Sequence, residues 1–283
     1  MILAVASGKG GTGKTSISVN LAMVLDVPVQ LLDCDVEEPN AHLFLKGQPI
    51  KEEVITLAIP KIDEALCDGC DKCVEFCQFN ALASVDGTPL LFPELCHACG
   101  GCTLVCPQGA IQEQNHRIGV ILTSQIGAIT LTTGCLDVGI SMASSLVNSV
   151  KHRLNDDIIN ILDAPPGTAC PAVATLRGAD FVVLVTEPTP FGLNDLKLAV
   201  DTVRKLHLSF GVVINRVGMG DDRVQRYCSE QKIPILLELP DDRRIAEAYS
   251  RGQIIVNALP EYRGHFERLW LSIQRESGMG GGQ

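Results

Sequence analysis

The stretch of sequence that decides the fold runs from residue 2 to residue 15 and reads Ile2-Leu3-Ala4-Val5-Ala6-Ser7-Gly8-Lys9-Gly10-Gly11-Thr12-Gly13-Lys14-Thr15. Its apolar start predicts a buried parallel strand, and the pattern G-x4-G-K-T that follows is typical of a phosphate-binding loop that opens a helix. Glycines let backbone N–H groups wrap a phosphate at a helix N-terminus. We therefore expect Lys14 to meet the β- and γ-phosphates of a nucleotide and Thr15 to ligate Mg²⁺. The strand–loop–helix context disfavours a glycine-rich loop without a ligand.

Short apolar segments alternate with helical patterns on both sides of this loop. This alternation predicts an α/β fold, a mostly parallel sheet with helices on both faces. The expected strands are 2–6, 27–32, 158–162, 181–185, 210–214 and 233–237, and the expected helices are 14–25, 193–206 and 221–230.

Acidic residues follow two of the expected strands, namely Asp33 and Asp35 after the second and Asp163 after the third. Parallel sheets bind ligands at the carboxyl ends of their strands, so these carboxylates are expected to face the phosphates. An aspartate at a strand end is more often a helix cap. Asp163 follows an apolar strand and precedes Pro-Pro-Gly, which favours a role at the site.

Eight of the twelve cysteines fall into two runs with the spacing C-x2-C-x2-C-x3-C: Cys67, Cys70, Cys73, Cys77 and Cys96, Cys99, Cys102, Cys106. Bacterial ferredoxins hold two [4Fe–4S] clusters with this spacing, and the fourth cysteine of each run ligates the other cluster. One cluster is therefore expected on Cys67, Cys70, Cys73 and Cys106, and the other on Cys96, Cys99, Cys102 and Cys77. Zinc suits a single C-x2-C pair and is disfavoured by two complete runs. Gln78 follows Cys77 where proline is usual.

The domain organisation follows from the cysteine runs. Residues 62–116 are expected to form a small α+β ferredoxin-like unit, inserted between the two parts, 1–61 and 117–277, of one nucleotide-binding domain. Alternating apolar residues between Arg117 and Thr132 predict a hairpin that returns the chain to the main sheet. Residues 278–283 are expected to be a disordered tail.

The composition of the chain argues against some classes of binding partner. The chain has 283 residues and a net charge of −10, which argues against nucleic acid or an anionic membrane as partner. The sequence has no apolar stretch long enough to predict a membrane span. Met1 to Ser7 lacks the layout of a signal peptide. Closely spaced cysteines without such a signal favour metal ligation in a reducing cytoplasm. Near the C-terminus, apolar residues at helical spacing predict a helix whose mixed charges suit packing on the sheet rather than a membrane.

A second lysine, Lys9, gives the loop the form K-G-G-x-G-K-T. In this the chain resembles the deviant-Walker ATPases that include MinD, ParA, Mrp-type scaffold proteins and the nitrogenase iron protein. The resemblance implies a nucleotide-sandwich homodimer in which Lys9 reaches the phosphates bound to the second protomer. It implies that Asp35 orients or activates the attacking water, that Asp33 lies near Mg²⁺, and that Asp163 holds Mg²⁺ through water. The residues expected to contact ATP are Gly8, Lys9, Gly10, Gly11, Thr12, Gly13, Lys14, Thr15, Ser16, the switch residue Asn40, the adenine-reading Asn215 and Arg216, and Pro240 and Asp241 of a loop closing over the base.

Four cysteines lie outside the two runs. Cys34 and Cys228 are expected to be small buried residues. Cys135 and Cys170 flank Asp163 at offsets similar to those of two cysteines in the nitrogenase iron protein. The resemblance implies a further [4Fe–4S] cluster shared by a dimer, and accidental spacing is the alternative.

Together these features predict a cytoplasmic, Mg²⁺-dependent ATPase, slow without a partner, whose nucleotide state controls its iron–sulfur clusters. It would donate electrons to a redox partner or help to build a metal cofactor in an apo-metalloprotein. The alternatives are a scaffold or carrier that hands over assembled clusters and a redox-sensing regulatory ATPase. A positioning ATPase would need a membrane helix or a basic DNA-binding face, and the sequence predicts neither.

Overall fold

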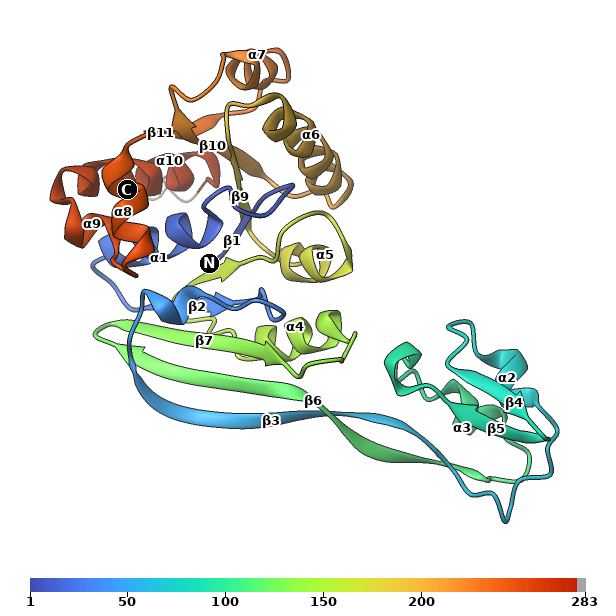
Figure 1. The fold of residues 1–283 in the computed structure, drawn as a ribbon. Coiled ribbons are helices and arrows are strands. Elements are labelled where there is room, and N and C mark those ends of the chain that lie inside the picture. The colour runs from blue at the N-terminus through green and yellow to red at the C-terminus, as the bar shows by residue number, and fades with distance from the viewer. Residues whose placement is uncertain (279–283) are drawn as a thin grey trace.

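The structure is a computed structural model that describes residues 1–278. Within them one large sheet has the strand order β11-β10-β9-β1-β8-β2-β7-β6-β3 (Figure 1). The strands from β11 to β7 run parallel, whereas β6 is antiparallel to both β7 and β3. The sheet strands are β1 (Ile2–Ala6), β2 (Val29–Asp33), β3 (Gln48–Ile62), β6 (Ile111–Ile126), β7 (Ile129–Leu136), β8 (Ile159–Asp163), β9 (Phe181–Thr186), β10 (Phe210–Val217) and β11 (Ile235–Pro240).

Helices cover both faces of the parallel part, as the sequence predicts for an α/β fold. One face packs against α1 (Lys14–Val24), α8 (Arg243–Ser250), α9 (Ile255–Ala258) and α10 (Arg263–Glu276). The other packs against α4 (Ala143–Lys151), α5 (Cys170–Leu176), α6 (Pro190–Lys205) and α7 (Arg223–Glu230). Short 3-10 helices occupy Ala41–Leu43, Pro93–Leu95 and Pro260–Tyr262. Phe266, Leu269 and Ile273 of α10 are fully buried, so the expected packing of the C-terminal helix on the sheet is confirmed.

The expected elements differ from the observed ones mainly at their ends, for local reasons. β2 begins at Val29, because Pro28 has no N–H to donate to a ladder. β11 likewise begins after Pro234. α6 begins at Pro190, because the hydroxyl of Thr189 accepts from the N–H of Gly192 at 3.0 Å and caps the helix earlier than its apolar pattern indicates.

A long two-stranded ribbon at the edge of the sheet was not predicted from the sequence. β3 and β6 pair from Gln48 opposite Gln125 to Ile62 opposite Ile111, and only the inner part of β6 also pairs with β7. Most side chains from Gln48 to Glu53 are exposed, so no apolar pattern marks this strand. The expected hairpin between β6 and β7 is confirmed, with its turn at Gly127 and Ala128.

The ribbon carries residues 63–110, here called the cysteine unit, beyond the edge of the main sheet (Figure 1). The unit contains α2 (Lys72–Phe76), the hairpin of β4 (Leu82–Val85) and β5 (Thr88–Leu91), and α3 (Gly101–Val105). Cys73 and Leu82 of the unit form a small buried apolar cluster with Ile111, the first residue of β6. It also contacts the main domain, because Ser141 donates to the carbonyl of Glu94 and Cys96 belongs to the same buried cluster as Met142.

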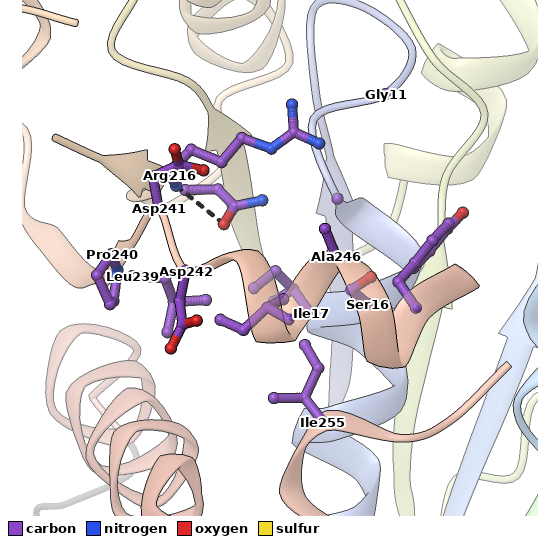
Figure 2. Close-up of a pocket in the computed structure, with 14 residues that line it drawn as sticks. Gly11, Ser16, Ile17, Arg216, Leu239, Pro240, Asp241, Asp242, Ala246 and Ile255 are labelled. Atoms are coloured by element: carbon purple, nitrogen blue, oxygen red, sulfur yellow. Dashed lines mark hydrogen bonds between the residues drawn. The ribbon is translucent and has the colours of Figure 1, made fainter. Parts of the chain in front are cut away.

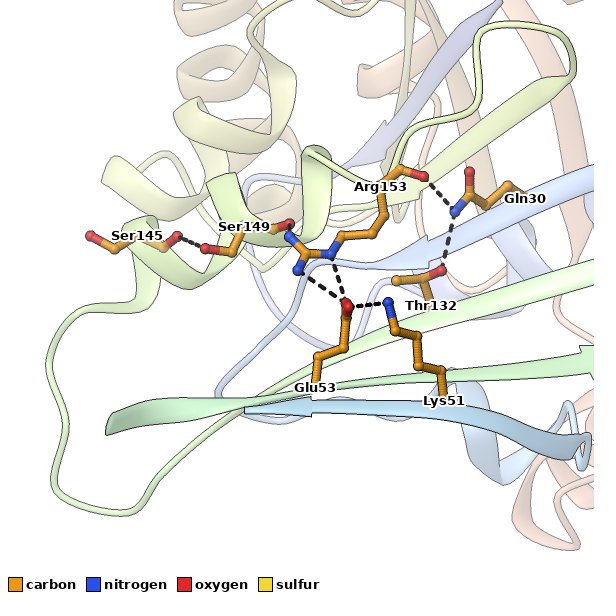
Figure 3. A network of polar contacts seen from close by, with 7 residues as sticks. All are labelled: Gln30, Lys51, Glu53, Thr132, Ser145, Ser149 and Arg153. Carbon is orange, nitrogen blue, oxygen red and sulfur yellow. Dashed lines mark hydrogen bonds and ion pairs between the residues drawn. The ribbon is translucent and has the colours of Figure 1, made fainter. Parts of the chain in front are cut away.

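Polar contacts fasten the base of the ribbon to the segment that follows α4 (Figure 3). Arg153 donates through Nε and NH2 to Oε1 of Glu53 on β3, at 3.1 and 3.0 Å. Lys51 pairs with the same carboxylate, and Gln30 donates to the carbonyl of Arg153 at 2.9 Å.

Among residues 1–278, no helix has both the length and the apolar character needed to cross a bilayer. Of the tail expected at 278–283, residues 279–283 lie outside the described residues.

Candidate functional site

The phosphate-binding loop lies between β1 and α1, at the carboxyl end of the sheet. Gly13 has φ of 95°, and a Cβ there would lie 2.6 Å from Nδ2 of Asn215. That amide nitrogen donates to the carbonyl of Thr12 at 2.8 Å. A Cβ on Gly8 would lie 2.1 Å from the carbonyl oxygen of Asp195, on α6. Glycine is therefore required at both positions, and the loop is held from two sides.

Lys14 is the buried cation of this loop, and only 7% of it is exposed. Burial lowers the pKa of its ammonium, and the nearby carboxylates of Asp163, Asp35 and Asp33 oppose that shift. No salt bridge to Lys14 occurs among residues 1–278. A buried ammonium that forms no direct ion pair favours binding of an anion.

Asp33 and Asp163 lie side by side in register at the ends of β2 and β8. Both are buried. Oδ2 of Asp33 accepts from the backbone N–H groups of Asn40 and Ala41, each at 2.9 Å. Burial raises the pKa of both carboxyls, and Asp163 raises the pKa of Asp33 further. Two buried carboxyl groups side by side are stabilised by a bound cation, as expected for a Mg²⁺ site.

The buried oxygen atoms around the loop that lack a hydrogen-bond partner within the described chain include Oδ2 of Asp163, Oδ1 of Asn40 and Oγ1 of Thr12. Oδ1 of Asp163, in contrast, accepts from Ser18 Oγ at 3.1 Å. Buried polar atoms are normally paired, so unpaired oxygens beside a buried lysine fit a site for Mg²⁺ and a nucleotide phosphate.

Asp35 lies at the same edge and is partly exposed. Burial raises the pKa of its carboxyl to about 6, and Lys14 acts against this shift. The carboxylate is thus mainly ionised at neutral pH but more basic than an exposed aspartate, which suits a group that receives a proton from water.

A pocket next to the loop has the composition expected for a base (Figure 2). Its apolar wall is formed by Ile17, Leu239, Ile245, Ala246, Tyr249 and Ile255. Asn215, Arg216, Pro240 and Asp241, which the sequence analysis assigned to adenine binding, line the same pocket, as do Gly11, Gly13 and Ser16. Asp242, the next residue of the loop expected to close over the base, also lines it and accepts from the hydroxyl of Tyr262 at 2.8 Å.

Glu187 is a site residue that sequence reasoning missed. Its Oε2 lies 2.9 Å from Nζ of Lys9, and its Oε1 lies 2.9 Å from NH1 of Arg216. It directly follows β9, which pairs with β1. The signal that identified Asp163, an acid at the end of an apolar strand, therefore also applies to Glu187.

The eight spaced cysteines surround two separate cavities in the cysteine unit. Cys67, Cys70, Cys73 and Cys106 line one, and Cys77, Cys96, Cys99 and Cys102 line the other. These are the two crossed sets expected from the spacing. All twelve cysteines are free thiols. Within residues 1–278 no three His, Cys, Asp or Glu side chains lie close enough to hold a single metal ion.

Each set of four thiols fits an iron–sulfur cluster in its chemistry. In the second cavity the backbone N–H of Ala81 donates to Sγ of Cys77 at 3.3 Å, and that of Ala98 to Sγ of Cys96 at 3.4 Å. Such bonds are typical around cluster thiolates. The rings of Phe79 and His97 stack beside this cavity with centroids 3.8 Å apart.

The four cysteines outside the two runs fall into a buried pair and a pair with exposed surface. Cys34 and Cys228 are fully buried, which confirms them as small buried residues. Cys135 lies on β7 and lines a surface pocket with His42 and Thr133, whereas Cys170 is exposed at the first residue of α5.

Comparisons with known proteins relate the chain to a nucleotide-binding family. A family model described as the CobQ/CobB/MinD/ParA nucleotide binding domain matches residues 3–256. An uncharacterized protein of Methanocaldococcus jannaschii is 33% identical over 280 residues, which cover 96% of this chain and 97% of that protein. An iron-sulfur cluster carrier protein of Aquifex aeolicus is 24% identical over 97% of this chain and 66% of its own length. The fold is similar to the septum site-determining protein MinD of Pyrococcus horikoshii, solved with Mg-ADP, with a TM-score of 0.60, 21% identity, and coverage of 100% of this chain and 99% of that one.

Proposed function

The chain belongs to the CobQ/CobB/MinD/ParA nucleotide-binding domain family, and from that premise we propose that it is an ATPase whose nucleotide state controls two [4Fe–4S] clusters. The observation that carries the proposal is the division of eight cysteines into two sets of four around two cavities, in a chain that also has a phosphate-binding loop. We propose that the clusters serve electron transfer to a redox partner or the assembly of a metal cofactor in an apo-protein.

The nucleotide chemistry is assigned to residues at the carboxyl end of the sheet. The loop from Gly8 to Ser16 wraps the phosphates, and Lys14 offsets the charge that develops on them. Thr15 and Asp163, with Asp33 beside it, would hold Mg²⁺, which would neutralise charge on the nucleotide phosphates. Asp35 orients the attacking water and accepts its proton.

The dimer is part of the same proposal. Lys9 extends from the loop and is the residue that reaches the phosphates of the second protomer. A site completed only in the dimer explains the slow hydrolysis that we propose for the separate protomer. A partner protein would then accelerate hydrolysis by favouring the closed dimer.

The clusters are assigned to the two crossed cysteine sets. When bound, [4Fe–4S] clusters supply one-electron transfer. The chain contributes eight thiolates, the N–H groups of Ala81 and Ala98, and the aromatic cover of Phe79 and His97. Because Cys96 is packed with Met142 of the main domain, the second cavity is the one placed to respond to the nucleotide.

A continuous set of contacts supports coupling between the two sites. α5 begins directly after the loop that follows Asp163, and Nζ of Lys151 at the end of α4 donates to the carbonyls of Ala174 and Thr175 on α5, at 2.7 and 3.1 Å. The loop before α4 contains Ser141, which contacts Glu94 in the cysteine unit. A shift of the loop after Asp163 would therefore move α5, α4 and the unit together.

A cluster carrier is the second candidate, favoured by the exposure of Cys170 and the partial exposure of Cys135. Two thiolates from each protomer would hold one more [4Fe–4S] cluster that is open to solvent and transferable. The named carrier relatives support this candidate at 24% identity. A redox-sensing ATPase differs from both, because its hydrolysis rate would change between oxidised and reduced protein.

The first experiment is to measure iron and acid-labile sulfide per chain after anaerobic reconstitution. About eight irons are expected for two clusters per chain, and about ten if a third cluster is shared by the dimer. Unchanged iron content in a Cys135→Ala/Cys170→Ala variant would rule out the shared cluster. Fewer than about four irons per chain would contradict the main proposal.

A further inference from the structure

Glu187 is a nearly buried carboxylate that contacts two cations through different oxygen atoms. Its side chain is 8% exposed, whereas those of Lys9 and Arg216 are 33% and 44% exposed. Oε2 pairs with Lys9 and Oε1 pairs with Arg216. The acid is therefore the most buried member of the group, and Lys9, on the phosphate-binding loop, is a cation that can leave it.

The backbone around Glu187 is locked. Its carbonyl accepts from the N–H of Thr189 at 2.8 Å, and a Cβ on Gly192 would lie 2.3 Å from the same oxygen. Thr186 Oγ1 donates to the carbonyl of Gly192 at 3.0 Å. The carboxylate is thus presented to Lys9 from a rigid turn between β9 and α6.

Removing a cation from a buried carboxylate is normally costly, because the charge is left unpaired. Here the guanidinium of Arg216 lies 2.9 Å from the other oxygen, an ion pair without hydrogen-bond geometry, so a positive charge stays beside Glu187 when Lys9 leaves. The presence of Arg216 lowers the free energy needed to separate Lys9 from Glu187. Lys9 nevertheless stays with Glu187 when no stronger anion is present. A phosphate with several negative charges is a better anion than one carboxylate.

We propose that Glu187 holds Lys9 within the separate protomer and releases it to the ATP phosphates of the second protomer when two protomers close. Glu187 is thus a positioning residue that sets the nucleotide concentration at which the dimer forms. This inference rests on the sandwich dimer of the proposed function, and it adds the regulation of that dimer.

The test compares the full chain with Glu187→Gln, which keeps the shape and removes the charge. Dimer formation is followed by sedimentation against the concentration of Mg²⁺ and a non-hydrolysable ATP analogue. The nucleotide concentration at which half of the protein is dimeric is expected to be lower in Glu187→Gln, by about tenfold for each Lys9 released. A tenfold change is equivalent to about 1.4 kcal/mol. A Lys9→Ala background should abolish this difference, and a midpoint that is unchanged or higher in Glu187→Gln would overturn the inference.

A second measurement reads the ion pair directly, without a dimer. The rate of Lys9 acylation in nucleotide-free protein, followed by mass spectrometry, should rise several-fold in Glu187→Gln while Lys61 on the ribbon reacts at an unchanged rate. Equal Lys9 rates in both proteins would show that Glu187 does not hold it. If Glu187→Gln fails to fold, Glu187→Asp keeps the charge on a shorter side chain and should give an intermediate rate. If Lys9→Ala forms the dimer as readily as the unmodified chain, the sandwich itself fails, which is a separate outcome.

Discussion

Arg153 and Glu53 join the segment after α4 to the base of the ribbon through two hydrogen bonds to one carboxylate oxygen, at 3.1 and 3.0 Å. The pair is 31% and 23% exposed, so solvent screens it only in part. It ties β3 to the segment that follows α4 (Figure 3).

Replacing Arg153 should therefore loosen the ribbon and lower stability. We expect Arg153→Met to reduce the free energy of unfolding by about 1 kcal/mol, because a charge-assisted pair is lost at a partly exposed site. Urea denaturation measures this. Arg243→Met is the matched control, because Arg243 pairs with Glu247 while 90% exposed, and it should change stability much less. Equal losses in the two variants would contradict the role given to Arg153.

The same pair gives a pH dependence with a definite sign. Hydrogen bonds from Lys51 and Arg153 lower the pKa of Glu53 in the folded chain. A carboxyl with a lowered folded pKa stabilises the fold above its unfolded pKa, and this contribution is lost as the pH falls through its folded value. The stability difference between the unmodified chain and Glu53→Gln should hold from pH 7 down to about 5 and shrink below about 4. A difference that grows on acidification would contradict the assignment.

Asp35→Asn should separate hydrolysis from binding. We expect phosphate release to fall by roughly 10²- to 10⁴-fold, the range for loss of a general base, while the affinity for a fluorescent ATP analogue changes little. Glu37→Gln is the control, because Glu37 is an exposed acid on the same loop. Hydrolysis that survives in Asp35→Asn would assign the water-activating role to another group.

The crossed cysteine sets predict which double cysteine variants lose no more iron than a single variant. Cys77→Ala should remove about four irons per chain, and Cys77→Ala/Cys99→Ala should remove no more, because both residues line one cavity. Cys77→Ala/Cys70→Ala should remove about eight, because Cys70 lines the other. Iron analysis with electron paramagnetic resonance distinguishes these cases. The reverse pattern would indicate that each run holds its own cluster.

The sequence predicted the parallel sheet well, because buried strands such as Val182 to Val185 are continuous apolar runs that local pattern reveals. The phosphate-binding loop and Asp163 were predictable for the same reason, since each is anchored to such a strand. The ribbon was not, because strands that leave the main sheet need no apolar alternation, and Lys51 to Glu53 carry charge instead.

Glu187 shows a different limit. Its neighbours Lys9 and Arg216 are distant in sequence, so the ion pairs exist only once β9, β1 and β10 lie side by side. The sorting of cysteines into cavities was predictable because the spacing itself carries the information. The contact between Ser141 and Glu94 was not, because it depends on where the ribbon carries the cysteine unit.

The pairing of Ile62 with Ile111 makes the cysteine unit separable from the sheet in topology. The two strands enter and leave the cysteine unit as direct neighbours, the spacing that a two-residue turn would need to close a simple hairpin. The unit therefore occupies the position of a hairpin turn. A short turn in place of residues 63–110 would close β3 and β6 without rerouting any strand of the nucleotide-binding sheet.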